Sequence, residues 1–181
     1  MTVARFVTLG HSNRSMDDVI AMLRAARVTA LADVRAFPRS RANPVFNIET
    51  FPDALARAGI SYRHFPALGG RRGKQEGVDP AVNGFWRERG FHNYADYTTG
   101  ADFAAGFAAL LDWAAGQCVA IMCSEAVWWR CHRRIITDHL LLSGHAVEHL
   151  LGLGQVTQAE PTAAAIRDAS GRIIYPAAAV G

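Results

Sequence analysis

Cysteine is scarce in this sequence, which has three in 181 residues and so lacks the disulfide framework of a small secreted domain. The opening residues, MTVARFVTLGHS, contain neither the apolar core nor the cleavage site of a signal peptide. The most apolar stretch, residues 103–123, is interrupted by Asp112 and Gly116 and is therefore not a membrane span. We expect a cytoplasmic protein with reduced thiols that does not associate with a membrane.

Common cofactor motifs are also missing. The sequence contains no CxxC pair, no P-loop and no dinucleotide-binding fingerprint. We therefore predict no cofactor and no metal, and a chemistry of hydrolysis or group transfer rather than redox. Half of the residues are hydrophobic, so a packed core is expected. The net charge of +3 is compatible with an anionic ligand but does not establish one.

Short apolar runs alternate with segments of helical periodicity along the chain. Ser15, with Asp18 three residues later, is a typical start for the helix that follows. The alternation predicts an α/β fold: a single domain with a mainly parallel sheet of about five strands and helices on both faces. The strands are expected at residues 4–10, 28–34, 60–65, 117–123 and 145–152. Further helices are expected from Asn47 or Thr50 to Arg57, and at 101–116 and 133–144.

The domain is expected to span residues 1–155. Residues 156–181, which include an alanine-rich tail, are interpreted as a C-terminal extension that packs on the domain or is partly flexible. Residues 66–100 are polar and too numerous for a simple connection, so this segment is expected to be functional or partly helical.

Polar residues follow four of the predicted strands. In a parallel sheet the carboxyl ends of the strands meet at one edge, and ligands bind outside that edge. We therefore expect a polar pocket there. Its segments are GHS with His11 and Ser12, DVR with Asp33 and Arg35, LGG with Gly69 and Gly70, and CSE with Cys123 and Glu125.

The same segments resemble the DUF488 family, whose name denotes a domain of unknown function. The resemblance extends over residues 8–150 and rests on TLGHS, LADVRAFPRSR, LGG, YADY, and MCSE followed at the family spacing by CHRR. It implies an α/β fold and a polar site built from these motifs, and it supplies no reaction. The sequence departs locally from the family at Trp128 and Trp129 and at YTT, which bears on the shape of the substrate.

Asp33 and Glu125 are the leading candidates for proton transfer. Each lies near the end of an apolar strand, where burial raises a carboxyl pKa unless a cation offsets it. Arg35 and Arg133 are the expected partners. Two carboxylates at one edge could activate water or protonate a leaving group. The alternative is that each forms a buried ion pair that holds the loops and does no chemistry. His11 is a further candidate for proton transfer.

Cys123, Cys131 and His132 lie within ten residues of one another. Two thiolates and an imidazole could bind zinc, but they lack the usual ligand spacing, and the adjacency of Cys131 and His132 makes joint ligation awkward. Cys131 precedes a predicted helix and two cationic residues, which favours a thiolate, so a thiol nucleophile is an alternative. We place His132 among the catalytic candidates and treat the two cysteines as supporting thiols.

Arginines and aromatic residues gather in the segments that lead to the predicted edge. Cations can hold an anion, and aromatic rings can stack on a nucleobase. We predict a hydrolase or group transferase that acts on a small anionic, nucleotide-like ligand. The alternative is a non-enzymatic nucleic-acid-binding protein, and the oligomeric state is left open. The predicted substrate-binding residues are Ser12, Arg35, Ser40, Arg41, Gly69, Gly70, Tyr97 and Arg133.

Overall fold

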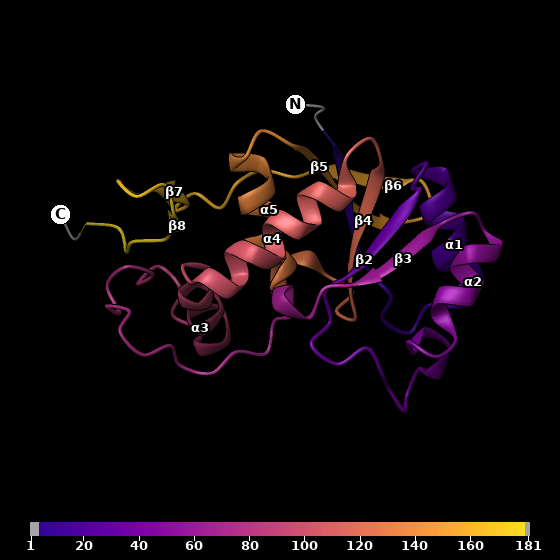
Figure 1. The fold of residues 1–181 in the computed structure, drawn as a ribbon, viewed down its shortest axis with the longest axis horizontal. Helices are drawn as coiled ribbons and strands as arrows, with labels where there is room; N and C mark the ends of the chain where they lie inside the picture. Colours follow the sequence, from indigo (N-terminus) through magenta and orange to yellow (C-terminus); the bar gives the residue numbers. More distant parts are fainter. Residues whose placement is uncertain (1–3, 180–181) are drawn as a thin grey trace.

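A six-stranded sheet forms the centre of the protein, for which a computed structural model describes residues 4–179 (Figure 1). The strands lie in the order β3-β2-β4-β1-β5-β6, and every neighbouring pair is parallel except β5 and β6. The predicted α/β class and the mainly parallel sheet are confirmed. The strands are β1 (Arg5–Gly10), β2 (Ala30–Asp33), β3 (Ser61–His64), β4 (Cys118–Cys123), β5 (Ala146–Gly152) and β6 (Gln155–Gln158).

The sixth strand, β6, was not expected from the sequence. It follows β5 through a tight turn in which Gly154 has a φ of 70°, a conformation that glycine adopts without strain. All four residues of β6 are exposed, so they lack the alternating burial that identifies a strand from its pattern. β6 therefore widens the sheet at one edge without adding to the core.

Helices cover both faces of the sheet, as predicted (Figure 1). Leu31 and Ala32 of β2 point to opposite faces, because successive strand residues alternate. Leu31 packs in a cluster with α1 and α2, whereas Ala32 packs in a cluster with α3, α4 and α5. Within residues 4–179 none of the helices combines the length and apolar character needed to cross a membrane. The helices are α1 (Met16–Ala25), α2 (Phe51–Arg57), α3 (Arg89–Thr98), α4 (Ala101–Ala114) and α5 (Arg133–Leu142).

The local signals for helix formation agree with these bounds. Ser15 caps α1 as predicted, because its hydroxyl accepts a hydrogen bond from the Asp18 backbone N–H at 3.0 Å. Thr50 precedes α2, which settles the choice left open between Asn47 and Thr50. The long segment 66–100 is partly helical, since it contains a 3₁₀ turn at Pro66–Leu68 and all of α3.

The connections that leave β1 and β4 diverge to opposite faces of the sheet. β1 continues through α1 to β2, whereas β4 continues through α5 to β5. The two strands are neighbours, and Gly10 and Cys123 at their carboxyl ends are in register. Diverging connections leave a crevice between them, and ligands of open α/β sheets bind in such a crevice. The topology therefore marks the ends of β1 and β4 as the place to look for a site.

The C-terminal segment packs on the domain as far as Tyr175, and residues 177–179 are exposed. Tyr175 is fully buried; its hydroxyl donates to Asp138 Oδ2 at 2.9 Å, and its backbone N–H donates to Asn83 Oδ1 at 3.0 Å. A short antiparallel pair, β7 (Ile166–Arg167) and β8 (Ile173–Ile174), precedes it. Of the extension predicted at 156–181, residues 180–181 lie outside the described part, as do residues 1–3 of the predicted domain. The boundary at residue 155 stays a prediction.

Candidate active site

A cleft of about 500 Å³ lies at the carboxyl edge of the sheet, where the ends of β1 and β4 meet. His11 lines it from the end of β1, and Cys123, Ser124 and Glu125 line it from the end of β4. The predicted pocket at this edge is therefore present in the structure, at the crevice that the diverging connections define. The remaining lining residues are Arg35, Ala36, Phe37, Arg39, Ser40, Gly70, Arg71, Glu88, Gly90, Phe91, Arg130, Cys131 and His132.

Two glycines allow the segments of the cleft to approach each other closely. A Cβ atom at Gly10 would lie 1.6 Å from the backbone oxygen of Glu125, so the segment after β4 crosses directly over the end of β1. A Cβ atom at Gly70 would lie 2.4 Å from His132 Nδ1. The glycines of TLGHS and LGG are therefore required by contacts within the site, and not by unusual backbone angles.

Cys123, Cys131 and His132 converge at the cleft. His132 Nε2 donates a hydrogen bond to the backbone oxygen of Val34 at 2.9 Å, so in the neutral ring the lone pair lies on Nδ1. His132 Nδ1 then points at both sulfur atoms, 3.5 Å from Cys131 Sγ and 3.9 Å from Cys123 Sγ. The three ligand atoms lie within 4.8 Å of one another. The sequence indicated that these three residues are close along the chain, but the adjacency of Cys131 and His132 argued against their meeting at one point.

The two cysteines have opposite protonation tendencies. Burial alone would raise the pKa of Cys131, but a hydrogen bond with Cys123 and the charge and N–H groups of Arg133 outweigh it and lower this pKa to about 6. Arg133 donates to Cys131 Sγ from Nε at 3.3 Å and from its backbone N–H at 3.5 Å. The Cys123 thiol shares a hydrogen bond with Cys131 and is buried, which raises its pKa to about 12. Of the two thiols, Cys131 is therefore the one whose surroundings favour loss of the proton.

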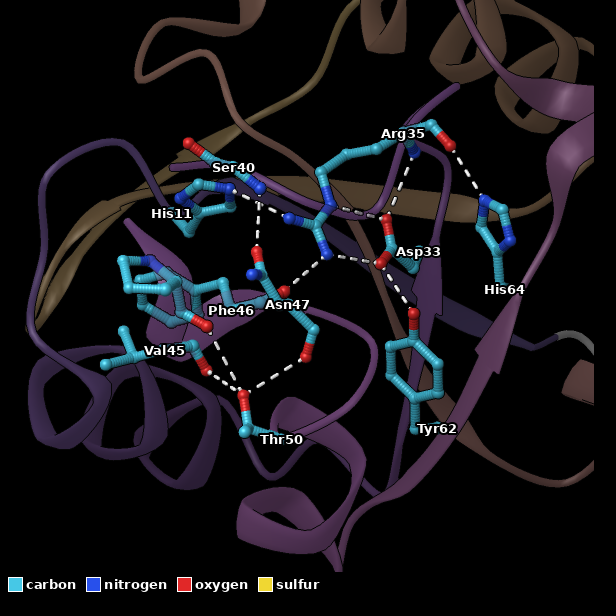
Figure 2. A network of polar contacts seen from close by, with 11 residues as sticks. His11, Asp33, Arg35, Ser40, Val45, Phe46, Asn47, Thr50, Tyr62 and His64 are labelled. Carbon is cyan, nitrogen blue, oxygen red and sulfur yellow. Dashed lines mark hydrogen bonds and ion pairs between the residues drawn. The ribbon is translucent and has the colours of Figure 1, made fainter. Parts of the chain in front are cut away.

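Asp33 lies in a closed network rather than in the cleft (Figure 2). Its carboxylate accepts from Arg35 Nε at 2.9 Å and Nη2 at 2.7 Å, and from the Tyr62 hydroxyl at 2.7 Å. The Arg35 backbone N–H adds a fourth hydrogen bond at 3.1 Å. Asp33 and Arg35 are both buried, so this geometry favours the alternative in which the carboxylate forms a buried ion pair.

His11 is buried between this network and the cleft. Its Nδ1–H donates to the backbone oxygen of Ser12 at 2.9 Å, and its Nε2 accepts from Arg35 Nη1 at 3.3 Å. The ring also stacks on Phe46 at a centroid distance of 4.5 Å. Burial lowers the pKa of His11, and the contact with the Arg35 cation acts in the same direction. His11 is therefore a neutral ring with both nitrogens engaged.

Glu125 lines the cleft and is exposed to solvent. The expected partial burial and the expected ion pair with Arg133 are both absent: Arg133 Nη2 donates to the backbone oxygen of Glu125, at 2.5 Å. Arg133 itself is buried, and its side chain contacts Cys131 instead. Glu125 thus remains a carboxylate with access to a bound ligand, whereas Arg133 acts on the thiols.

The predicted substrate-binding residues divide into two groups. Arg35, Ser40 and Gly70 line the cleft, whereas Ser12, Arg41, Gly69, Tyr97 and Arg133 are not among its lining residues within the described part of the chain. Tyr97 is buried beneath the guanidinium of Arg72, 3.9 Å from its ring centroid. Exposed cations at the cleft come instead from three arginines, which are Arg39, Arg71 and Arg130.

Most of the aromatic residues that suggested base stacking are buried or already stacked on another side chain. Trp86, Tyr94 and Tyr97 are buried, and Trp128 stacks on His149 at a centroid distance of 4.3 Å. Phe37, which is 67% exposed and lines the cleft, offers the freest ring at the site. Phe37 and Phe91 were not expected at the cleft from the sequence, because the residue type and its neighbours do not distinguish a binding role from packing for a phenylalanine.

The fold and the cleft together define an α/β protein with a site at a topological switch point. A family model described as "Domain of unknown function DUF488" matches residues 15–140, which is more than half of the chain. The chain belongs to the DUF488 family, so the resemblance inferred from its motifs is confirmed. No curated protein and no solved structure matches the chain.

Proposed function

We propose that the protein is a hydrolase or group transferase that binds a small anionic, nucleotide-like substrate in the cleft at the carboxyl edge of the sheet. The observation that carries the proposal is the convergence of Cys123, Cys131 and His132 on a cleft that exposed arginines also line. Its volume of about 500 Å³ is within the range of roughly 300–1,000 Å³ that is usual for small-molecule sites.

Charge and shape support an anionic substrate with a planar part. Arg39, Arg71 and Arg130 line the cleft together with the exposed carboxylates of Glu88 and Glu125. Arg39 is paired with Glu49, whereas Arg71 and Arg130 form no ion pair within residues 4–179 and are therefore the guanidinium groups open to an anion. Guanidinium groups bind phosphate and carboxylate with a favourable planar geometry. The guanidinium carbon of Arg71 lies 5.6 Å from the centroid of the exposed Phe37 ring. This ring can stack on a base.

The chemistry is assigned to the cysteine–histidine cluster rather than to the carboxylate pair. Asp33 has all of its hydrogen bonds directed at Arg35 and Tyr62, so it is not available to a substrate. Cys131 and His132 line the cleft and carry the reactive lone pairs. Glu125 is retained as a group that can exchange a proton with a bound ligand, because it is exposed in the same cleft.

Binding is tested first, with nucleoside phosphates, sugar phosphates and inorganic phosphate as probes in thermal-shift and calorimetric titrations. Arg71→Ala and Arg130→Ala should each weaken binding of the best probe by about tenfold, which corresponds to about 1.4 kcal/mol. Arg57→Ala is the control, since Arg57 is exposed on α2 at the opposite face of the sheet from α5. Equal binding by the Arg71→Ala/Arg130→Ala double variant would contradict an anion site here.

Turnover is tested next with the probes that bind. Cys131→Ser should abolish turnover of a bound probe while binding is retained, because the arginines and Phe37 are unchanged. A protein that binds single-stranded RNA with a steep salt dependence, and binds none of the small probes, would instead support the nucleic-acid alternative.

A further inference from the structure

We propose that Cys123, Cys131 and His132 bind one transition-metal ion of the zinc class, with a fourth coordination position open to the cleft. The inference goes beyond the proposed function, because it does not depend on which substrate the cleft binds. The sequence pattern did not favour a metal, since Cys131 and His132 are adjacent. The backbone removes this difficulty: Cys131 is extended (φ −125°, ψ 147°) and His132 is helical (φ −56°, ψ −16°), and both ligand atoms reach the same point.

The separations between the ligand atoms fit a tetrahedral ion. Bond lengths of about 2.3 Å to sulfur and about 2.0–2.1 Å to nitrogen place sulfur and nitrogen about 3.6 Å apart, and two sulfurs about 3.8 Å apart. His132 Nδ1 lies 3.5 Å from Cys131 Sγ and 3.9 Å from Cys123 Sγ, and the three atoms lie within 4.8 Å of one another. The two nitrogen–sulfur separations therefore agree with a tetrahedral ion to within a few tenths of an ångström, and the sulfur–sulfur separation exceeds the tetrahedral value by at most about 1 Å.

The imidazole of His132 is oriented as a metal ligand requires. Its Nε2–H donates to the backbone oxygen of Val34 at 2.9 Å, so the lone pair on Nδ1 faces the sulfurs. A metal-bound histidine usually donates its second N–H to a carboxylate or a backbone carbonyl in this way. Tyr94 packs edge-on against the ring at a centroid distance of 5.1 Å, and Gly70 approaches it from another side. The ring therefore has little freedom to turn away.

The surroundings of the sulfurs also suit an ion. Arg133 is buried, and within residues 4–179 it forms no ion pair with a carboxylate. Its Nε–H is directed at Cys131 Sγ at 3.3 Å, a contact that stabilises the thiolate form in which cysteine binds metals. Two thiolates would cancel the charge of a divalent ion, which lowers the cost of holding it in a buried position.

Three protein ligands and one open position are typical of catalytic rather than structural zinc. All three ligands line the cleft, so the open position faces the place where a substrate would bind. An ion there could polarise a substrate oxygen or lower the pKa of a bound water, and either effect suits a hydrolase or group transferase. Sulfur and imidazole ligands favour zinc over magnesium or calcium, which prefer oxygen.

The test uses the full-length reduced protein after treatment with a chelator. Titration with Co²⁺, a spectroscopic substitute for Zn²⁺, should give one ion per chain, with thiolate-to-cobalt absorption in the near ultraviolet and tetrahedral bands in the visible range. Added Zn²⁺ should abolish these bands. Cys123→Ser, Cys131→Ser and His132→Ala should each reduce affinity by about 100-fold or more, beyond the roughly 10–100-fold effects of groups that only support a ligand.

Cys118→Ser is the matched control, because it removes the third cysteine, which lies at the other end of β4 from Cys123. This variant should bind Co²⁺ like the unaltered protein. A second measurement requires no variant: Zn²⁺ should slow alkylation of Cys123 and Cys131, mapped by mass spectrometry, and leave that of Cys118 unchanged.

The proposal is overturned if the unaltered protein shows no thiolate-to-cobalt absorption, or if Zn²⁺ protects neither Cys123 nor Cys131. An equal loss of binding in Cys118→Ser would also overturn it. These outcomes are independent of the proposed function, because binding of the anionic probes is measured separately on metal-free protein. Anion binding without metal binding refutes this inference alone, and metal binding without anion binding refutes the proposed substrate alone.

Discussion

Replacing Asp33 with asparagine removes the negative charge from an ion pair that is almost entirely buried. The side chain of Asp33 has no exposed surface, and that of Arg35 is 5% exposed. The carboxylate accepts four hydrogen bonds, three from Arg35 and one from Tyr62. Asparagine keeps one acceptor oxygen and presents an amide N–H₂ to donors, so the guanidinium loses both its counter-charge and part of its hydrogen bonding.

The expected loss of stability follows from the burial of the pair. Removing one partner of a buried ion pair costs about 3–5 kcal/mol, because the remaining charge has no compensation. A domain of this size is stable by about 5–15 kcal/mol in total, so the variant loses a large share. With a urea dependence of about 2 kcal/mol per molar, the unfolding midpoint of Asp33→Asn should fall by about 2 M.

Urea unfolding followed by circular dichroism checks this expectation, with Asp112→Asn as the control. Asp112 is exposed in the last turn of α4, and the same change of chemistry there should alter stability by less than about 0.5 kcal/mol. A loss below about 1 kcal/mol in Asp33→Asn, together with loss of turnover on a bound probe, would refute the structural role. Asp33 would then return as a candidate for proton transfer.

Three further predictions concern other parts of the molecule. Gly70→Ala should lower the affinity for Co²⁺ by about tenfold or more, because the added methyl group would overlap the His132 ring and displace it. Gly73→Ala is the control and should have no effect, because no atom lies within 4 Å of a methyl group added there. Burial lowers the pKa of His139 to about 3, so the unfolded chain binds this proton first, and His139 should contribute about 2–3 kcal/mol to the fall in stability from pH 6.5 to pH 4.5 in urea titrations. His139→Leu should reduce the fall by that amount and leave the part due to His149, whose pKa burial lowers to about 4. Tyr175→Phe removes one of the two hydrogen bonds to the buried Asp138 carboxylate, the other coming from the Thr162 backbone N–H, and should cost about 1–3 kcal/mol in the same assay. No change would mean that the Tyr175 hydroxyl contributes little to stability.

The fold could be predicted from local patterns because its central strands, β1, β2 and β4, are almost wholly buried. The β2 and β4 segments read as continuous apolar runs, which is typical of parallel strands covered on both faces. The strand order could not be predicted, since it depends on contacts between segments far apart in sequence. β6 was not predicted, because all of its residues are exposed and they show no hydrophobic pattern.

The position of the site could be predicted from the sequence, but the role of each residue in it could not. The strand ends fixed which segments meet at the edge. Whether a side chain at this edge points into the cleft or into the protein interior changes when the end of the strand shifts by one or two residues. Asp33 and Arg35 are two residues apart, a spacing that lets them pair with each other, and this was the one local sign of their structural role. The closeness of Cys123, Cys131 and His132 along the chain allowed a joint site, but the usual ligand spacing was missing, and the loop conformation that brings them together could not be predicted.

The DVR segment at the end of β2 connects the buried ion pair to the proposed metal site. Asp33 holds Arg35, whose backbone oxygen also accepts a hydrogen bond from His64 Nε2 at 2.8 Å (Figure 2). Between them lies Val34, whose backbone oxygen orients His132 toward the two sulfurs. The ion pair therefore clamps the backbone on both sides of the carbonyl that positions the proposed metal ligand. It follows that Asp33→Asn should weaken Co²⁺ binding even under conditions where the variant is folded, although Asp33 itself touches neither the cleft nor the cluster.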